Sequence, residues 1–285
     1  MKTFIPFICF FFLLLLNTFF RWPVDNGKIT STFGESRGDH FHDGVDIISS
    51  NNRVYPVADG ELLYFWDKSI FPIENYPGGG NYKIIKHDDN IYSIYMHLTE
   101  GLGYNKFYMT NETLGSIGNT GRSYGKHLHF SLLNIFEKRS INPFILLPEY
   151  TDIQQPKILD LYIRVADRYF IINDNTNIRI TRHYPLLINI IDSINRRERL
   201  GIFRLRVIFN NQKAMELDFS EIAYSKNGLT IGGKTFQNLF DEKGYYKICN
   251  ITYNDGLNHL KVVTSDYSGN ESTKEISFTV KLEII

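Results

Sequence analysis

The sequence predicts a mainly β protein with two units, an antiparallel β-sheet domain followed by a β-sandwich. Short runs of alternating apolar and polar residues recur along the 285-residue chain, and turns rich in glycine and asparagine separate them. Long segments with the 3.6-residue period of an amphipathic helix are missing between residues 27 and 132. Prolines and polar residues around 150–156 then indicate a boundary between the two units.

The chain begins with an apolar segment that precedes both units. Lys2 provides a positive charge, residues 4–20 are almost wholly apolar, and Arg21 ends the run. This pattern is typical of an export signal. The run also lies at the short edge of the roughly 17–25 residues that a membrane-spanning helix needs. No Ala-x-Ala cleavage site precedes Arg21, so two alternatives stay open for residues 1–21. They are a signal peptide that is removed and an N-terminal membrane anchor that is retained.

The composition indicates a folded chain and excludes one class of partner. Apolar residues make up 43% of the chain and aromatic residues 15%, which is enough to bury a core. Lysine plus arginine number 31, and aspartate plus glutamate also number 31. A chain without net charge lacks the basic surface of a nucleic-acid-binding protein. Beyond the N-terminal segment Cys249 is the one cysteine, so no internal disulfide is expected.

The first unit, residues 22–150, is expected to consist of strands joined by tight turns. Residues 53–66 contain two alternating runs around an Asp-Gly pair, which is typical of a hairpin turn. Residues 81–98 alternate in the same way around an Asp-Asp-Asn turn, and residues 112–133 end in another alternating strand. This series of hairpins predicts an antiparallel sheet.

The second unit, residues 157–285, contains evenly spaced strand-like runs. Turns such as Asn254-Asp255-Gly256 and Ser268-Gly269-Asn270 separate them. Even spacing of short alternating strands favours an immunoglobulin-like β-sandwich. Residues 259–272 also resemble the last hairpin of many bacterial immunoglobulin-like modules, in which an aspartate and a Gly-Asn pair form the turn.

Six of the eight histidines lie between residues 40 and 129, which indicates a site in the first unit. His127 and His129 occupy alternate positions of a predicted strand. Their side chains should therefore share a face, about 7 Å apart at roughly 3.3 Å per residue. This separation suits one metal ligand and one neighbour that reaches a metal-bound water.

His42 and Asp46 lie four residues apart, which is about 13 Å along a straight strand and too far to bind one ion. Gly44 between them permits a bend that would bring the two together. Two histidines and one carboxylate leave one zinc position open, as in catalytic rather than structural zinc sites. His40 mimics the spacing of the later histidine pair, but the positions of Gly44 and Asp46 favour His42 as the ligand. His40 is expected at the rim of the site or exposed to solvent.

Three motifs occur together and in order: HDGVD at residues 42–46, YMHL at 95–98 and HLHF at 127–130. With them, residues 28–145 resemble the M23 family of zinc metallopeptidases, the lysostaphin-type peptidoglycan endopeptidases. Any one of these motifs alone would be a weak signal, whereas the ordered set is specific.

The resemblance implies roles for five residues. His42, Asp46 and His129 would bind Zn2+, and His97 and His127 would flank the open position. The zinc would polarise the scissile carbonyl and lower the pKa of a bound water. The two flanking histidines would transfer protons or stabilise the oxyanion, because histidine titrates near neutral pH and no His-Glu-x-x-His motif supplies a glutamate base.

The resemblance thus implies an exported zinc metalloendopeptidase that hydrolyses peptide cross-links of bacterial peptidoglycan, in the periplasm or associated with the cell envelope. The alternative is an inactive module that binds the cell wall or activates an amidase, but the complete set of five residues favours the enzyme. A lipoyl- or biotinyl-type carrier is a third alternative, because residues 54–62 resemble strands of that fold. No lysine stands out at a hairpin tip, which argues against it. The second unit has no evident catalytic cluster and is expected to dock to the wall or to a protein partner.

Overall fold

The computed structural model describes residues 20–283 except 75–77, 102, 194–199 and 227. It confirms the mainly β fold class, with antiparallel pairing dominant. The apolar segment of residues 4–20, predicted to be an export signal or an anchor, lies almost entirely outside the described residues. Within the described residues, no helix is both long and apolar enough to cross a membrane.

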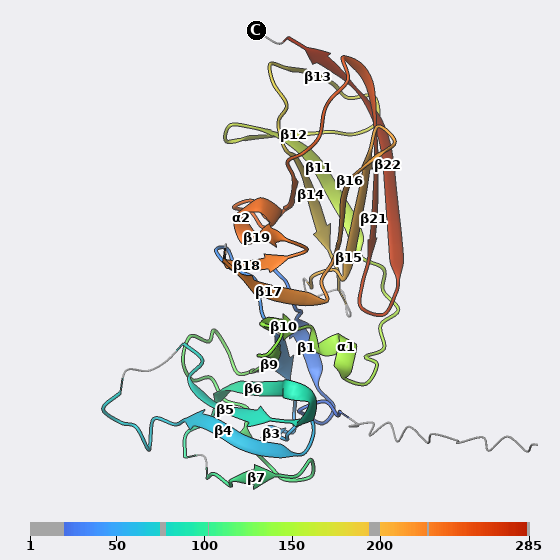
Figure 1. The fold of residues 1–285 in the computed structure, drawn as a ribbon. Helices are drawn as coiled ribbons and strands as arrows, with labels where there is room; N and C mark the ends of the chain where they lie inside the picture. The colour runs from blue at the N-terminus through green and yellow to red at the C-terminus, as the bar shows by residue number, and fades with distance from the viewer. Residues whose placement is uncertain (1–19, 75–77, 102, 194–199, 227, 284–285) are drawn as a thin grey trace, which may run out of the picture.

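The N-terminal unit is built on one antiparallel sheet (Figure 1). Its strands are β1 (Lys28–Ser31), β2 (Val45–Ile48), β4 (Gly60–Trp66), β5 (Asn81–Lys86), β6 (Ile91–Leu98), β7 (Phe107–Tyr108), β9 (Leu128–Asn134) and β10 (Arg139–Ile141). They follow the spatial order β10-β9-β6-β5-β4-β7, while β2 pairs with both β1 and β9. A separate short pair consists of β3 (Arg53–Val54) and β8 (Gly115–Ser116). Buried and half-buried residues alternate along most of β6, as expected for a strand with one face on the core.

The C-terminal unit contains two sheets that enclose an apolar core. The first has the strand order β12 (Arg168–Ile171), β11 (Lys157–Val165), β14 (Leu186–Ile191) and β20 (Tyr246–Ile248). The second has the order β13 (Asn177–Ile180), β22 (Glu271–Leu282), β21 (Gly256–Ser265), β15 (Arg204–Phe209) and β16 (Gln212–Asp218). Leu161 of the first sheet and Val262 and Phe278 of the second are fully buried in the same cluster. The arrangement is a β-sandwich, and its assignment as immunoglobulin-like stays a prediction.

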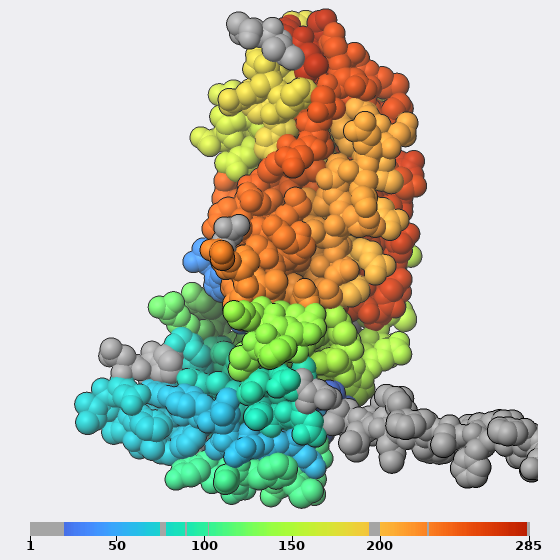
Figure 2. Space-filling model, in the orientation of Figure 1, coloured from blue at the N-terminus to red at the C-terminus, as the bar shows by residue number. Residues whose placement is uncertain are grey.

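The sheet of the N-terminal unit also includes strands that follow the predicted boundary in the sequence. Strand β10 pairs with β17 (Glu221–Ser225), which continues through β18 (Gly228–Ile231) to β19 (Lys234–Thr235). Helix α1 (Pro143–Leu146) lies between the two units, whereas α2 (Phe236–Leu239) follows β19 and contributes Phe236 and Leu239 to the core of the second unit. Figure 2 shows the green segment around α1 directly beneath the orange residues of the second unit. Residues that the sequence assigned to the second unit thus complete the sheet of the first.

Candidate metal centre

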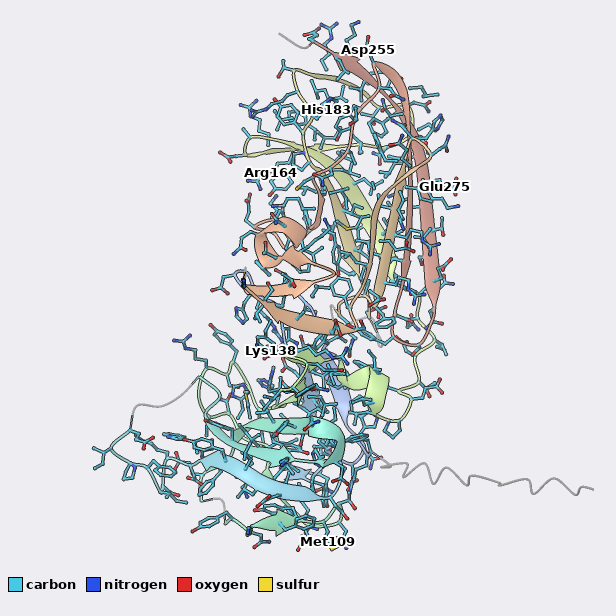
Figure 3. The ribbon with its side chains drawn as sticks, viewed as in Figure 1. Met109, Lys138, Arg164, His183, Asp255 and Glu275 are labelled. Carbon is cyan, nitrogen blue, oxygen red and sulfur yellow. The ribbon has the colours of Figure 1, made fainter. Side chains whose placement is uncertain are left out.

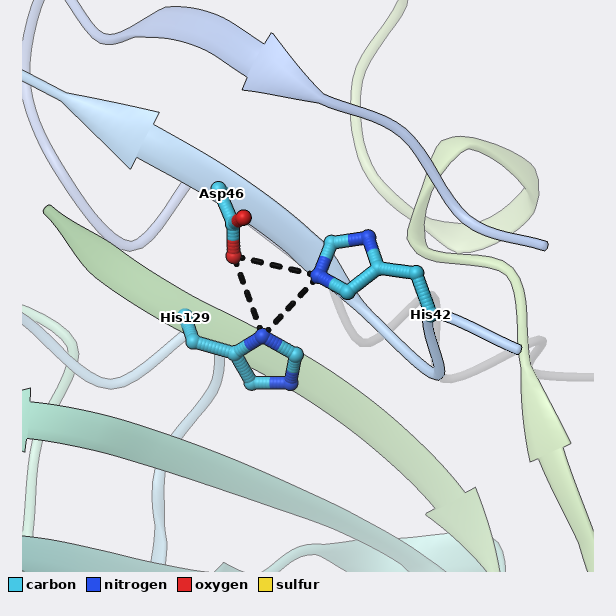
Figure 4. A group of neighbouring side chains, drawn as sticks. All are labelled: His42, Asp46 and His129. Atoms are coloured by element: carbon cyan, nitrogen blue, oxygen red, sulfur yellow. Dashed lines mark hydrogen bonds and ion pairs between the residues drawn. The ribbon is translucent and has the colours of Figure 1, made fainter. Parts of the chain in front are cut away.

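Two histidines and one aspartate converge at one point of the N-terminal unit. His42 Nε2 lies 3.1 Å from Asp46 Oδ1 and 3.0 Å from His129 Nδ1. The third side of this triangle, from His129 Nδ1 to Asp46 Oδ1, measures 3.0 Å (Figure 4). All three side chains are buried, with exposed fractions of 4% for His42 and 8% for Asp46 and His129.

Strand pairing accounts for one side of this triangle, from Asp46 to His129. Strands β2 and β9 are antiparallel neighbours, and their register places Asp46 directly opposite His129. Side chains of directly opposed residues lie on the same face of a sheet with their Cβ atoms roughly 4.5–5.5 Å apart. The sequence expectation that His129 is a ligand therefore has a simple structural counterpart.

A bend at Gly44 brings His42 to the same point. His42 precedes β2, and the chain bends at Gly44 before the strand begins. A Cβ at Gly44 would lie 2.4 Å from Phe130 O and 2.9 Å from His129 Nε2. Glycine is required here for the bend that the sequence predicted and also because β9 passes too close for any side chain.

Hydrogen bonds at the remaining ring nitrogens orient both histidines. His42 Nδ1 lies 2.7 Å from Thr32 O and must donate to it, so Nε2 presents a lone pair. His129 Nε2 lies 2.9 Å from Ser131 Oγ and 3.3 Å from a carboxylate oxygen of Asp43, which leaves the lone pair on Nδ1. Two nitrogen lone pairs and a carboxylate oxygen thus face one another, an arrangement that is repulsive unless a cation lies between them.

The pKa shifts of Asp46 and His129 also favour a positive charge between these three side chains. Burial raises the pKa of Asp46, but hydrogen bonds with His129 and His42 outweigh burial and hold the pKa far below its usual range. Burial lowers the pKa of His129, but hydrogen bonds with Asp43 and Asp46 outweigh it and raise the pKa to about 9. When no metal is bound, a proton on His129 satisfies the cluster, and metal binding must release that proton.

His97 and His127 lie beside the triangle without joining it. Their ring centroids are 4.9 Å apart, and His127 Nε2 lies 3.6 Å from Asp46 Oδ1. His97 Nδ1 lies 2.8 Å from Thr120 O and donates to it, so its Nε2 is an acceptor. Burial lowers the pKa of His97 to about 4, and the residue is therefore neutral at pH 7.

The backbone at His97 departs from the regular strand. Its φ of 61° is in the left-handed region, which residues other than glycine adopt uncommonly. The alternation of β6 ends here, because His97 and Leu98 are both buried. A left-handed residue at a cluster of titratable side chains is typical of functional sites.

The other histidines stay outside the triangle. His40 is exposed, and its Nδ1 lies 2.5 Å from Oδ1 of Asp39. It lines the cavity but is not one of the three residues whose ligand atoms converge. His87 is buried, and its two ring nitrogens form hydrogen bonds with Asp59 O and Ser93 Oγ. Figure 3 places His183 in the second unit, beyond the junction marked by Lys138.

A cavity of about 700 Å³ opens over the five predicted residues. Gly78 and Gly79 line it, and so do Arg122, Tyr124 and Lys126.

Residues 40–143 match the family model described as Peptidase family M23. Residues 40–143 therefore form an M23 peptidase domain. A second family model, which carries no description, matches residues 155–281.

Curated relatives of the M23 domain include both a protein named as a hydrolase activator and one named as an endopeptidase. Murein hydrolase activator NlpD of Escherichia coli (strain K12) is 32% identical over 131 residues, 45% of this chain and 31% of that protein. Peptidoglycan DD-endopeptidase ShyA of Vibrio cholerae is 30% identical over 128 residues, 42% of this chain and 28% of that protein. The chain therefore spans about a third of the length of the curated relatives it matches.

Among solved structures, a zinc containing peptidase from Vibrio cholerae is 30% identical to the chain. The match covers 41% of this chain and 36% of that chain, with a TM-score of 0.35.

The donor set of the M23 domain fits a zinc ion. Ligand atoms 2.0–2.1 Å from a tetrahedral zinc lie roughly 3.3 Å apart, close to the separations of the three convergent atoms. Asp46 Oδ2 accepts a hydrogen bond from Arg37 Nη2 at 2.7 Å, which leaves Oδ1 for a metal. Three protein ligands of mixed nitrogen and oxygen type leave the fourth zinc position open.

Several residues that support the site were not identified from the sequence. They are Thr32, Arg37, Asp43, Thr120 and Ser131, which contact His42, His129, Asp46 or His97. Ser131 was open to prediction, because it lies two residues after His129 and so shares its strand face. Thr32 and Thr120 act through backbone carbonyls, which carry no side-chain signal in a sequence.

Proposed function

We propose that the M23 domain is a zinc metalloendopeptidase that hydrolyses peptide cross-links of bacterial peptidoglycan. The observation that carries the proposal is the convergence of His42, Asp46 and His129, with His97 and His127 beside them, in one open cavity. The substrate class is supported by relatives of Vibrio cholerae that are named peptidoglycan DD-endopeptidases. The export pattern of residues 1–21 is consistent with this substrate and supports a location in the cell envelope.

In this mechanism the ligand triad would hold zinc, which supplies a Lewis acid that polarises a carbonyl and lowers the pKa of water. His97 presents Nε2 as an acceptor, so it is placed to accept a proton from the attacking water. His127 is half-buried with Nε2 facing the ligand triad, so it suits stabilisation of the developing oxyanion or protonation of the leaving amine. Arg37 holds Asp46 Oδ2 and keeps the carboxylate fixed during these steps.

The test combines metal analysis with digestion of purified peptidoglycan. Wild-type protein is expected to contain about one zinc per chain and to release soluble fragments, while His129→Ala loses both properties. His40→Ala is the matched control, because His40 lies on the same loop as His42 and lines the cavity without approaching the triad. This control should retain zinc and most of the activity. Zinc-loaded wild type that releases no fragments contradicts the proposal.

A second function is favoured by the name of the Escherichia coli relative, a murein hydrolase activator. In that case the protein would bind a separate amidase or the wall, with the C-terminal unit as a docking surface. The same digestion with an added amidase separates the two functions. Faster amidase digestion by both wild type and His129→Ala, with no fragments released by the protein alone, would support the activator.

A further inference from the structure

Three aspartates from distant parts of the chain meet beside the junction of the two units. Asp152 lies in the connector between α1 and β11, Asp192 directly follows β14, and Asp266 directly follows β21. One carboxylate oxygen of each lies within 4.8 Å of the other two. Asp192 and Asp266 are only 3% and 2% exposed, and Asp152 is half-buried. The cluster is separate from the metal centre of the M23 domain and shares no residue with it.

The carboxylate of Asp192 has an unsatisfied oxygen in this cluster. Asp192 Oδ1 is buried and has no hydrogen-bond partner. In the described part of the chain, no lysine or arginine forms an ion pair with any of the three carboxylates. Burying a carboxylate beside two others without a compensating charge is strongly unfavourable. Burial and the negative charges of Asp266 and Asp152 accordingly raise the pKa of Asp192 to about 7.

The other two carboxylates are held in place by backbone and amide groups. Asp266 Oδ1 accepts hydrogen bonds from the amides of Ser268 and Asn270, and its Oδ2 accepts one from Asn270 Nδ2. Asn270 Nδ2 also donates to Asp152 O at 3.0 Å, which links the β21–β22 turn to the connector. Asp152 Oδ1 accepts from the amide of Gln154. Each carboxylate keeps lone pairs that these hydrogen bonds do not use.

We propose that Asp152, Asp192 and Asp266 bind a calcium ion. All donors are oxygens, which excludes a preference for soft metals and favours a hard cation. Oxygens that share one calcium at 2.3–2.6 Å lie at most about 5 Å apart, a limit that the cluster meets. Calcium also accepts ligands from irregular loops, whereas magnesium requires a nearly ideal octahedron. The ion would satisfy Asp192 Oδ1 and fasten the connector to the sandwich.

Isothermal titration calorimetry with CaCl2 tests this site in the full-length chain. The protein is first loaded with zinc and then freed of calcium by dialysis against resin-treated buffer. Wild type should bind one calcium ion, and saturating calcium should raise its melting temperature by roughly 5 °C. Asp192→Asn and Asp152→Asn should each weaken calcium binding at least tenfold. Asp152→Asn covers the case in which Asp192→Asn fails to fold, because Asp152 is only half-buried.

Asp167→Asn is the matched control, since Asp167 is fully exposed and its replacement removes the same charge. It should bind calcium as wild type does. The proposal is overturned if wild type binds no calcium, if binding survives both cluster substitutions, or if magnesium binds as tightly as calcium. Stabilisation of the calcium-free protein by Asp192→Asn, without calcium binding by wild type, would instead show that the carboxyls share a proton.

Discussion

Gly44 shows how closely the chain segments that carry the predicted metal ligands approach each other. The space that a Cβ would need is taken by Phe130 O at 2.4 Å and His129 Nε2 at 2.9 Å. One of these atoms is backbone and the other belongs to a ligand, so neither can yield without moving the site. The residue that the sequence identified as a bend is therefore also the residue that sets the ligand geometry.

Gly44→Ala is expected to push β9 away from β2 and to separate His129 from Asp46. We expect a destabilisation of about 1–3 kcal/mol, because overpacking forces the backbone to shift. Zinc affinity should fall at least tenfold, measured by competition with a chromogenic chelator. Gly103→Ala is the control, because a Cβ there meets nothing within 4 Å. Unchanged zinc affinity in Gly44→Ala would contradict this account.

Lys83 is a fully buried lysine in the sheet of the M23 domain. Its Nζ donates to Gly103 O at 2.6 Å, Tyr108 OH at 2.8 Å and Leu114 O at 2.7 Å, so all three donors are used. Burial nevertheless lowers the pKa of Lys83 from 10.5 to about 8. Lys83→Met should cost about 2–4 kcal/mol, because it leaves these acceptors unsatisfied.

The lowered pKa also predicts a pH dependence of stability. Between pH 8 and pH 10.5 the unfolded chain still holds a proton on Lys83 that the folded chain has lost. The free energy of unfolding contributed by this residue therefore rises with pH across that window. Urea unfolding of wild type and Lys83→Met should show a difference that grows with pH, whereas exposed Lys106→Met should parallel wild type. A constant difference between wild type and Lys83→Met would argue against the lowered pKa.

At the scale of strands, the period of two explains what the sequence could predict about the site. His127 and His129 were placed on one face by alternation, and the register of β2 with β9 adds Asp46 to that face. The pairing of β10 with β17 at the junction of the two units could not be predicted in this way. Strand β17 carries the same alternation whether it pairs within the sandwich or with β10, and long-range pairing leaves no local signal. The carbonyls of Thr32 and Thr120, which orient His42 and His97, could not be predicted either, because a backbone carbonyl carries no side-chain signal in a sequence.

Asn142 tests the importance of this strand junction. It is fully buried; Oδ1 accepts from the amide of Phe144 and caps α1, while Nδ2 donates to Phe219 O at 2.7 Å in the second unit. Asn142→Ala removes both bonds and should destabilise the protein by about 2–3 kcal/mol in chemical denaturation. Exposed Asn250→Ala should leave stability within about 0.5 kcal/mol of wild type. Equal stabilities of the two variants would show that the junction contributes little.

At the scale of the whole molecule, the C-terminal unit packs against the segment that carries His42. The Phe41 ring contacts those of Phe236 and Phe240, with centroids 5.4 Å and 6.1 Å away. Tyr267 OH donates to Phe33 O, and Gly201 N donates to Thr32 Oγ1. Thr32 is also the residue whose carbonyl orients His42. The second unit therefore supports His42, a predicted ligand of the metal centre, through Phe41, which precedes it, and Thr32, which is hydrogen-bonded to it.

Phe236→Ala is expected to weaken the metal centre without touching it. The substitution leaves a cavity beside Phe41, so His42 loses the packing that fixes its loop, and zinc affinity should fall roughly tenfold as for other groups that support metal ligands. Phe278→Ala is the matched control, because it removes a buried ring of the sandwich core that contacts Phe209 and Tyr253 instead. Both variants should lose about 3–5 kcal/mol of stability. Only Phe236→Ala should lose zinc affinity while still folded at low temperature, and equal zinc affinity in the two folded variants would mean that the C-terminal unit does not support the site.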